Sequence, residues 1–280
     1  QVPVHGEAEE QRRGGEGGGA IAASGSNPVR AALVRGSLAV PPPPPPAPFP
    51  EYHLVFSTDC GDYQRWQSYL LFHSALTVGQ PGTVTRIASG CTDEEAEEER
   101  KWHDDHVSGP MSASFVLHLT PHFSNVKDED GNETGKSYDF FNKPFGVRHW
   151  FEEGEGMGAA TVRDKPDTLV VLIDPDMILL RPLNGILSPG DVYVGGSPDR
   201  MRVEPGRPFA SEYGFGANWL KHGLRELTPE GSKARDMANK EAAERYAVGP
   251  PYMATAGDFY EIAKKWTDYV PRVHKVYPHL

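Results

Sequence analysis

Apolar and polar residues follow two different periods along the chain from Glu51 onward. Short apolar runs predict buried strands at 53–57, 84–89, 114–119, 169–173 and 191–194. Apolar residues at helical spacing predict helices at 63–76, 138–152, 228–246 and 258–273. Strands that alternate with helices are typical of an α/β fold, so we expect a mostly parallel sheet flanked by helices.

Glycine and proline set the expected ends of these elements. Gly79 ends the first helix, and Pro144 must lie near the start of the second. Thr228 is expected to cap the third helix, with proline at its first position. The run at 249–251 (Gly-Pro-Pro) predicts a turn before the last helix.

The first fifty residues differ in composition from the rest of the 280-residue chain. They contain a glycine-rich stretch at 14–19 and six consecutive prolines at 41–46. Such a segment buries too little apolar surface to offset the entropy of ordering it. We therefore expect a disordered tail at 1–50, with the prolines as an extended rod, and one folded domain at 51–280.

The net charge of −11 argues against general nucleic-acid binding, because no basic stripe is present to contact phosphates. Much of the acidity lies at 93–105, which we interpret as a solvated loop or helix face. The most apolar part of the tail, 31–40, is short and contains Arg35, so it cannot span a bilayer. Either the protein is soluble or a membrane anchor lies outside this chain.

Cys60 and Cys91 are the two cysteines, too few for a disulfide scaffold or a zinc site. Each follows a predicted strand, so the two could lie near each other. Both a disulfide, in an oxidising compartment, and two buried free thiols are consistent with the sequence. Asn132 begins an Asn-Glu-Thr glycosylation sequon, which weakly favours a secretory lumen.

The strongest candidate for chemistry is Asp174-Pro175-Asp176, directly after the apolar strand 169–173. Ligands of open α/β sheets bind at the carboxyl ends of strands. Two carboxylates so close together repel each other unless a cation lies between them, and oxygen ligands suit Mg²⁺ or Mn²⁺. The alternative is an ordinary Asp-rich turn.

With its flanking segments, this motif resembles the metal motif of GT-A glycosyltransferases. More specifically, the chain resembles the hydroxyproline O-arabinosyltransferase and peptidyl serine α-galactosyltransferase group of plants and algae. The similar stretches lie in the family's order and are YHLVFSTDCGDYQRWQ (52–67), GQPGTVTRIASGC (79–91), NKPFGVRHW (142–150), LVVLIDPDMILLRPL (169–183), YGFGANWL (213–220) and VGPPYMATAGDF (248–259). The resemblance implies a GT-A-like, Rossmann-like sheet that is C-terminally incomplete in this chain.

The resemblance also implies a donor site for a UDP-sugar with Mn²⁺, or Mg²⁺, as cofactor. Asp174 and Asp176 would hold the metal, and Lys143 would be a cation for the diphosphate. The other implied contacts are Thr58 and Asp59 beside the nucleotide, Asp62 and Tyr63 near the uracil, Arg86 near the nucleotide, Gly214, Gly216 and Asn218 at the donor sugar, and Gly249-Pro250-Pro251 with Tyr252 near the acceptor. Ordinary surface residues, turns and ion pairs are the competing interpretations.

Histidines give weaker signals. Pro121 prevents one helix from presenting both His118 and His122 to a metal. The pair at positions 103 and 106 lies in the acidic run, where we expect solvated side chains. His274 and His279 are candidates for a third metal ligand by position only, and that ligand could also lie beyond residue 280.

The resemblance implies transfer of arabinose or galactose to a serine or hydroxyproline hydroxyl of a protein, with retention of configuration, in the Golgi or secretory lumen. One alternative is a haloacid-dehalogenase-type phosphatase, in which Asp174 would be the nucleophile. That motif normally lies near the start of its domain, whereas here it lies deep in the chain. A further alternative is an inactive, truncated transferase that only binds peptide or polysaccharide. The sequence leaves open the donor sugar and any residue acting on the sugar face.

Overall fold

The computed structural model describes residues 49–127, 130–187, 193–194, 202–213, 217, 220 and 224–277. All of them fall within one compact unit, Pro46–Leu280. The predicted tail at 1–50 therefore lies outside the described residues, except for Phe49 and Pro50.

A seven-stranded sheet forms the centre of this unit, in the order β3-β2-β1-β6-β9-β8-β7. Its first half is parallel and consists of β3 (Phe115–Thr120), β2 (Thr83–Ser89), β1 (Tyr52–Thr58) and β6 (Leu169–Ile173). Antiparallel pairing adds β9 (Val248–Thr255), β8 (Phe209–Glu212) and β7 (Tyr193–Val194). Because β8 runs in the same direction as β6, most strands point one way, and the predicted α/β class is confirmed.

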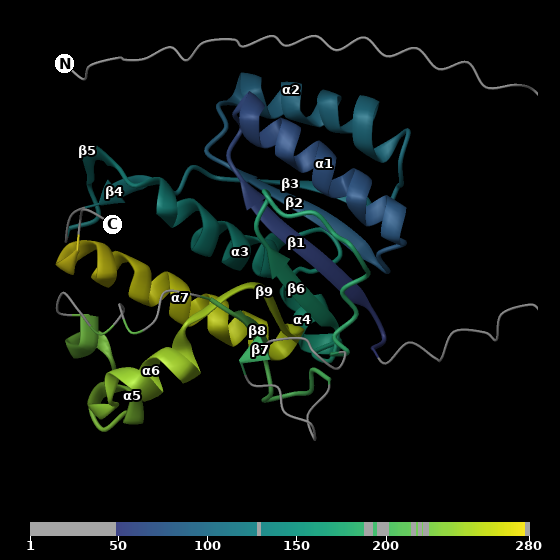
Figure 1. Cartoon of the computed structure of the whole chain (residues 1–280). Coiled ribbons are helices and arrows are strands. Elements are labelled where there is room, and N and C mark those ends of the chain that lie inside the picture. Colours follow the sequence, from purple (N-terminus) through teal and green to yellow (C-terminus); the bar gives the residue numbers. More distant parts are fainter. Residues whose placement is uncertain are drawn as a thin grey trace, which may run out of the picture. The chain divides into compact units, whose positions relative to one another are not determined.

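Helices cover both faces of the sheet (Figure 1). Side chains of β1 alternate between two apolar cores, with Leu54 and Phe56 on one side and Val55 on the other. The first core also contains α1 (Asp62–Val78) and lies on the side of α2 (Asp93–His103). The second contains α3 (Asn142–Glu153), α4 (Ala159–Asp164) and α7 (Ala256–Val276).

Several predicted ends are confirmed. Strand β6 begins and ends at the predicted residues. Helix α1 ends at Gly79, whose φ of 66° is the left-handed conformation that glycine adopts most easily. Pro144 lies in the first turn of α3, where its missing N–H costs no helical hydrogen bond. The predicted start of this helix at residue 138 is wrong, because α3 begins at Asn142 and the residues before it form a separate 3-10 turn, η2 (Asp139–Phe141).

The prediction of a single helix at 228–246 is wrong. The segment contains the short α5 (Lys233–Asp236) and then α6 (Asn239–Tyr246), and Thr228 follows the 3-10 turn η4 (Leu224–Leu227). Gly231 has a φ of 75°, which a helix cannot contain, and the Ser232 side chain caps the new helix by accepting from the Ala234 N–H.

The predicted turn at 249–251 is also wrong, because these residues lie inside β9, where Pro250 and Pro251 are joined by a cis peptide. The register on β8 shifts at this point: Tyr252 pairs with Ala210, and Gly249 pairs with the next residue, Ser211. Both prolines thus lie between the two shifted pairs, where hydrogen bonding between β9 and β8 requires no N–H group from them.

The acidic run forms α2 and a following π-helical turn, η1 (Asp104–Ser108). Thr92 begins α2 with a capping box, in which its side chain accepts from the Glu95 N–H. Most of the run is exposed, as predicted, but Glu99 and His103 are buried. The His103 imidazole lies 3.0 Å from the Phe115 carbonyl, so the expectation of a solvated side chain there is wrong.

Candidate functional site

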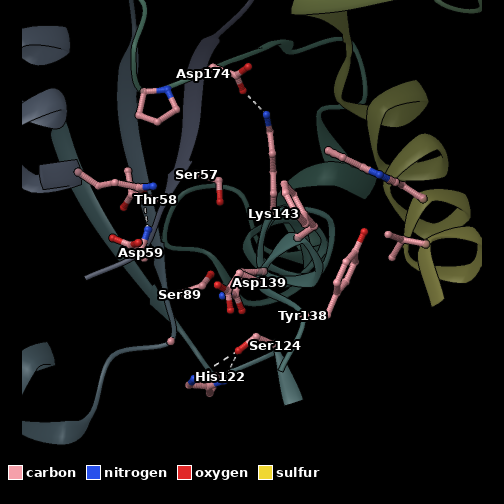
Figure 2. A pocket seen from close by; sticks show the side chains of 17 residues that line it. Ser57, Thr58, Asp59, Ser89, His122, Ser124, Tyr138, Asp139, Lys143 and Asp174 are labelled. Atoms are coloured by element: carbon pink, nitrogen blue, oxygen red, sulfur yellow. Dashed lines mark hydrogen bonds and ion pairs between the residues drawn. The ribbon is translucent and has the colours of Figure 1, made fainter. Parts of the chain in front are cut away.

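A cavity of about 650 Å³ opens at the carboxyl ends of the parallel strands (Figure 2). Strands β1 and β2 contribute the residues at which they end, β6 contributes the residues that directly follow it, and the segment after β3 contributes a wall. The first residues of α3 and the middle of α7 close the remaining sides. The parallel topology therefore brings together segments that are far apart in the sequence.

Asp174 directly follows β6 and lines this cavity. Its carboxylate forms an ion pair with the ammonium of Lys143, which reaches across from the first turn of α3 (Figure 2). The side chains of Asp174 and Lys143 are 31% and 29% exposed, so solvent screens this pair only partly. The structure thus brings together two of the residues that the sequence singled out.

Asp176 is exposed and does not line the cavity. In the described part of the chain, no three His, Cys, Asp or Glu side chains form a group that could hold a metal ion. Mg²⁺ and Mn²⁺ commonly use one or two carboxylates and complete their shell with water and substrate phosphates. The oxygen donors of Asp174 and Asp176 fit that partial role, and the ammonium on Asp174 shows that this carboxylate attracts a cation.

Thr58 and Asp59 line the cavity at the end of β1, together with Ser57. The Asp59 N–H donates to the Gln64 side chain at 2.6 Å, and the Asp59 carboxylate accepts from the Gly61 N–H at 2.8 Å. These bonds hold the first turn after β1 in one conformation, with polar groups directed at the cavity.

Arg86 does not line the cavity, because its side chain is fully buried beneath this turn. Its guanidinium donates to Thr58 Oγ1 at 2.9 Å and to the Asp59 carbonyl at 3.0 Å. Glu99 of α2 supplies the counter-charge, with 2.5 Å between Arg86 Nη1 and Glu99 Oε2. The surface ion pair considered from the sequence is thus a buried one that supports the cavity wall.

Asp62 and Tyr63 lie in the first turn of α1 and do not line the cavity. Asp62 forms an exposed ion pair with Arg65 at 3.1 Å, and Tyr63 stacks on Trp66 with 6.2 Å between the ring centroids. Their proposed uracil contacts remain predictions. Gly214, Gly216 and Asn218 lie outside the described residues, as does His279.

Cys60 and Cys91 form a disulfide, which decides between the two alternatives left open by the sequence. Their Cα atoms lie 5.4 Å apart. The bond joins the turns that follow β1 and β2, next to the cavity residues Asp59 and Gly90. Both turns are therefore fixed relative to each other.

The predicted acceptor residue Tyr252 lines a neighbouring apolar cavity of about 450 Å³ rather than the one described above. Burial, with Asp174 and Tyr213 nearby, raises the pKa of Tyr252 to about 12. Its phenol therefore stays neutral near Asp174 at physiological pH. Trp266 of α7 lines both cavities.

None of the histidines that the structure describes forms a metal site with Asp174. His118 contacts His149 at 3.0 Å between ring nitrogens, whereas His122 lines the main cavity and contacts Ser124 at 2.9 Å. His274 packs on Tyr138, with 4.1 Å between the ring centroids.

One part of the cavity wall was not predicted from the sequence: Tyr138, Asp139, Phe140, Trp266 and Val270. The first three were predicted to lie in a helix, and the last two were counted as parts of an amphipathic helix. An unusual signal was present, because four of the five residues at 138–142 are aromatic or acidic and precede the helix that carries Lys143.

No family model matches the chain. Over 224 residues, or 79% of the chain, it is 29% identical to a peptidyl serine alpha-galactosyltransferase of Arabidopsis thaliana. A peptidyl serine alpha-galactosyltransferase of Chlamydomonas reinhardtii is 31% identical over 130 residues, or 46% of the chain. The chain is related in sequence to these two transferases. It spans only 23% and 14% of their respective lengths.

Solved structures give a more distant likeness. The glycosyltransferase GlyE of Streptococcus pneumoniae TIGR4 is 12% identical, with 82% of this chain and 40% of that chain covered and a TM-score of 0.37. The bifunctional WbbM glycosyltransferase is also 12% identical, with 80% and 34% covered and a TM-score of 0.36.

Proposed function

We propose that this chain carries the donor site of an enzyme that transfers a sugar from a UDP-sugar to a protein hydroxyl group, on serine or hydroxyproline. The ion pair between Lys143 and Asp174, at the mouth of the parallel strands, is the observation that carries the proposal. The sequence relation to two proteins named peptidyl serine alpha-galactosyltransferase favours serine as acceptor and galactose as donor sugar.

In this proposal Asp174 and Asp176 hold Mn²⁺, or Mg²⁺, together with the diphosphate of the donor. The divalent ion supplies positive charge that offsets the charge of the departing diphosphate. Thr58 and Asp59 provide polar groups at the nucleoside side of the cavity. The strands β1 and β6, which these residues end or follow, are paired with each other in the centre of the sheet.

Lys143 contributes to catalysis through electrostatics. The acceptor hydroxyl oxygen forms a bond to the anomeric carbon while the bond from that carbon to the diphosphate oxygen breaks. The electron pair of the broken bond leaves with UDP as negative charge, and the hydroxyl proton passes to the departing diphosphate oxygen and from there to solvent. An ammonium held in a partly buried cavity stabilises that charge more than it would in water. Lys143 lies in the first turn of α3, and the N-terminus of a helix favours negative charge, which supports this role.

The disulfide between Cys60 and Cys91 supports an oxidising compartment, such as the lumen of the secretory pathway or Golgi. The exposed sequon at Asn132 is compatible with the same location. None of the helices in the described part of the chain has the length and apolarity that crossing a membrane requires.

The test is turnover of UDP-galactose and UDP-arabinose by the 280-residue chain, with Mn²⁺ or with EDTA. We expect UDP release that requires Mn²⁺ and is lost in Asp176→Asn, and incorporation of labelled sugar into a serine peptide. Asp176 is exposed, so the substitution should leave folding intact. Release of phosphate from a phosphomonoester would instead favour the phosphatase alternative. Peptide binding without any turnover would favour the inactive binding module.

A further inference from the structure

The cavity has two chemically different ends. The end formed by Thr58, Asp59, Lys143 and Asp174 is polar and charged, as a nucleotide diphosphate requires. The aromatic end consists of Tyr138, Phe140 and Trp266, with Val270 and Asp139 in the same wall, and its Tyr138 lies across the cavity from Thr58 and Asp59 (Figure 2). The proposed donor contacts use the first end and leave the aromatic end without a role.

Phe140 is 66% exposed, whereas the next residue, Phe141, is 6% exposed and packs against the rings of Tyr138 and Phe145. Phe141 therefore accounts for the packing of this 3-10 turn. Phe140 adds little buried apolar area, and an exposed phenyl ring that faces a cavity is typical of a surface that becomes covered by a ligand.

The aromatic end is firmly held. The Tyr138 N–H donates to the Ser124 carbonyl at 2.8 Å, which extends the hairpin of β4 (Asn125–Lys127) and β5 (Glu133–Ser137). The Tyr138 ring packs against Phe140, with 5.3 Å between centroids, and against His274 at 4.1 Å. The Ser137 hydroxyl donates to Asp139 at 3.0 Å and orients its carboxylate.

We infer that Tyr138, Phe140 and Trp266 form the subsite for the polypeptide acceptor, and that they contact an apolar side chain next to the residue that receives the sugar. This inference rests on the proposed function. Aromatic faces bind apolar side chains by burying their surface, and the Asp139 carboxylate is positioned to accept a hydrogen bond from the peptide backbone.

A nucleobase is the main rival for the aromatic rings. The uracil of the donor would need hydrogen-bonding partners for its polar edge, and these lie at the other side of the cavity, where Asp59 and Gln64 line the wall. In Figure 2, Tyr138 lies on the other side of the cavity from Thr58 and Asp59, so an acceptor on the aromatic rings and a nucleoside at the end of β1 do not compete for the same wall.

The experiment compares two fluorescent peptides, one with leucine and one with glycine next to a serine. Binding is measured by polarisation with UDP and Mn²⁺ present, for the wild type, Phe140→Ala and Leu76→Ala. Leu76 is a matched control, because it is 45% exposed and does not line the cavity. UDP affinity is measured in parallel by calorimetry.

We expect the wild type and Leu76→Ala to bind the leucine peptide about tenfold more tightly than the glycine peptide, because one aromatic contact contributes about that much. Phe140→Ala should lose this preference while its UDP affinity stays unchanged. Equal binding of both peptides by the wild type, or an unchanged preference in Phe140→Ala, overturns the inference. If Phe140→Ala binds UDP more weakly than the wild type but binds both peptides as well as the wild type does, the rings contact the uracil, and the inference is also overturned. Peptide preference without any UDP binding by the wild type supports the subsite and refutes the proposed donor site.

Discussion

Replacing Glu99 with alanine removes the counter-charge of Arg86 in the interior of the protein. Both side chains have 0% exposure, and 2.5 Å separates Arg86 Nη1 from Glu99 Oε2. Glu99 also accepts from Arg65 at 2.9 Å. In the variant, Arg86 keeps its bonds to the Thr58 hydroxyl and the Asp59 carbonyl, but its charge remains buried without an acidic partner.

Breaking a buried ion pair by removing one partner costs about 3–5 kcal/mol, because the remaining charge stays desolvated. Domains of this kind have unfolding free energies of about 5–15 kcal/mol, so the expected loss is a large fraction of the total. Urea unfolding followed by tryptophan fluorescence measures it directly. Glu98→Ala is the control, since Glu98 is exposed in the same helix, and we expect it to change stability by less than about 0.5 kcal/mol.

The double variant Arg86→Met with Glu99→Leu removes both charges and fills their space with apolar side chains of similar size. It should therefore recover most of the stability lost in Glu99→Ala. If Glu99→Ala instead lies within about 1 kcal/mol of Glu98→Ala, the buried pair does not stabilise the fold and the reasoning is refuted.

Three further predictions concern the disulfide, the pH response and the cavity lysine. Reduction of Cys60–Cys91, which are 31 residues apart, should lower the unfolding free energy by about 3–4 kcal/mol, seen as a reductant-dependent loss of thermal stability. Burial and the nearby His149 lower the pKa of His118 to about 4. Between about pH 6.5 and 4 the unfolded chain therefore binds a proton that the folded chain does not, so stability should fall as pH falls, and less so in His118→Phe. Lys143→Met should weaken UDP binding in calorimetry by about tenfold or more, and unchanged affinity would contradict its assigned role.

The parallel half of the fold could be predicted because its strands are buried on both faces. Strand β6 reads as a continuous apolar run, and every residue in it is buried. The position of Asp174 at the cavity followed from the same argument, since a residue directly after a central strand must lie at the carboxyl edge.

The antiparallel half could not be predicted in this way. Strand β9 is interrupted by two prolines, and only the shifted register on β8 makes room for them. Local sequence carries no information about that register, because it depends on residues about forty positions earlier in the chain.

In the candidate site, too, the residues with a local sequence signal could be predicted and the others could not. Lys143 and Asp174 were found because each has a local signal, a helix start and a strand end. The burial of Arg86 could not be predicted, because it depends on Glu99, which lies within a helix whose other acidic residues are exposed. The aromatic wall was missed because Phe140 and Trp266 belong to distant elements that meet only in the folded chain.

The most direct test of the donor site is calorimetric titration of UDP into the wild type and Asp176→Asn, each with and without Mn²⁺. The account predicts tight binding to the wild type only when Mn²⁺ is present, and a loss of this Mn²⁺ dependence in Asp176→Asn. Binding of UDP that is the same in both proteins, with or without the ion, would show that Asp174-Pro175-Asp176 is a turn and not part of a nucleotide-sugar site.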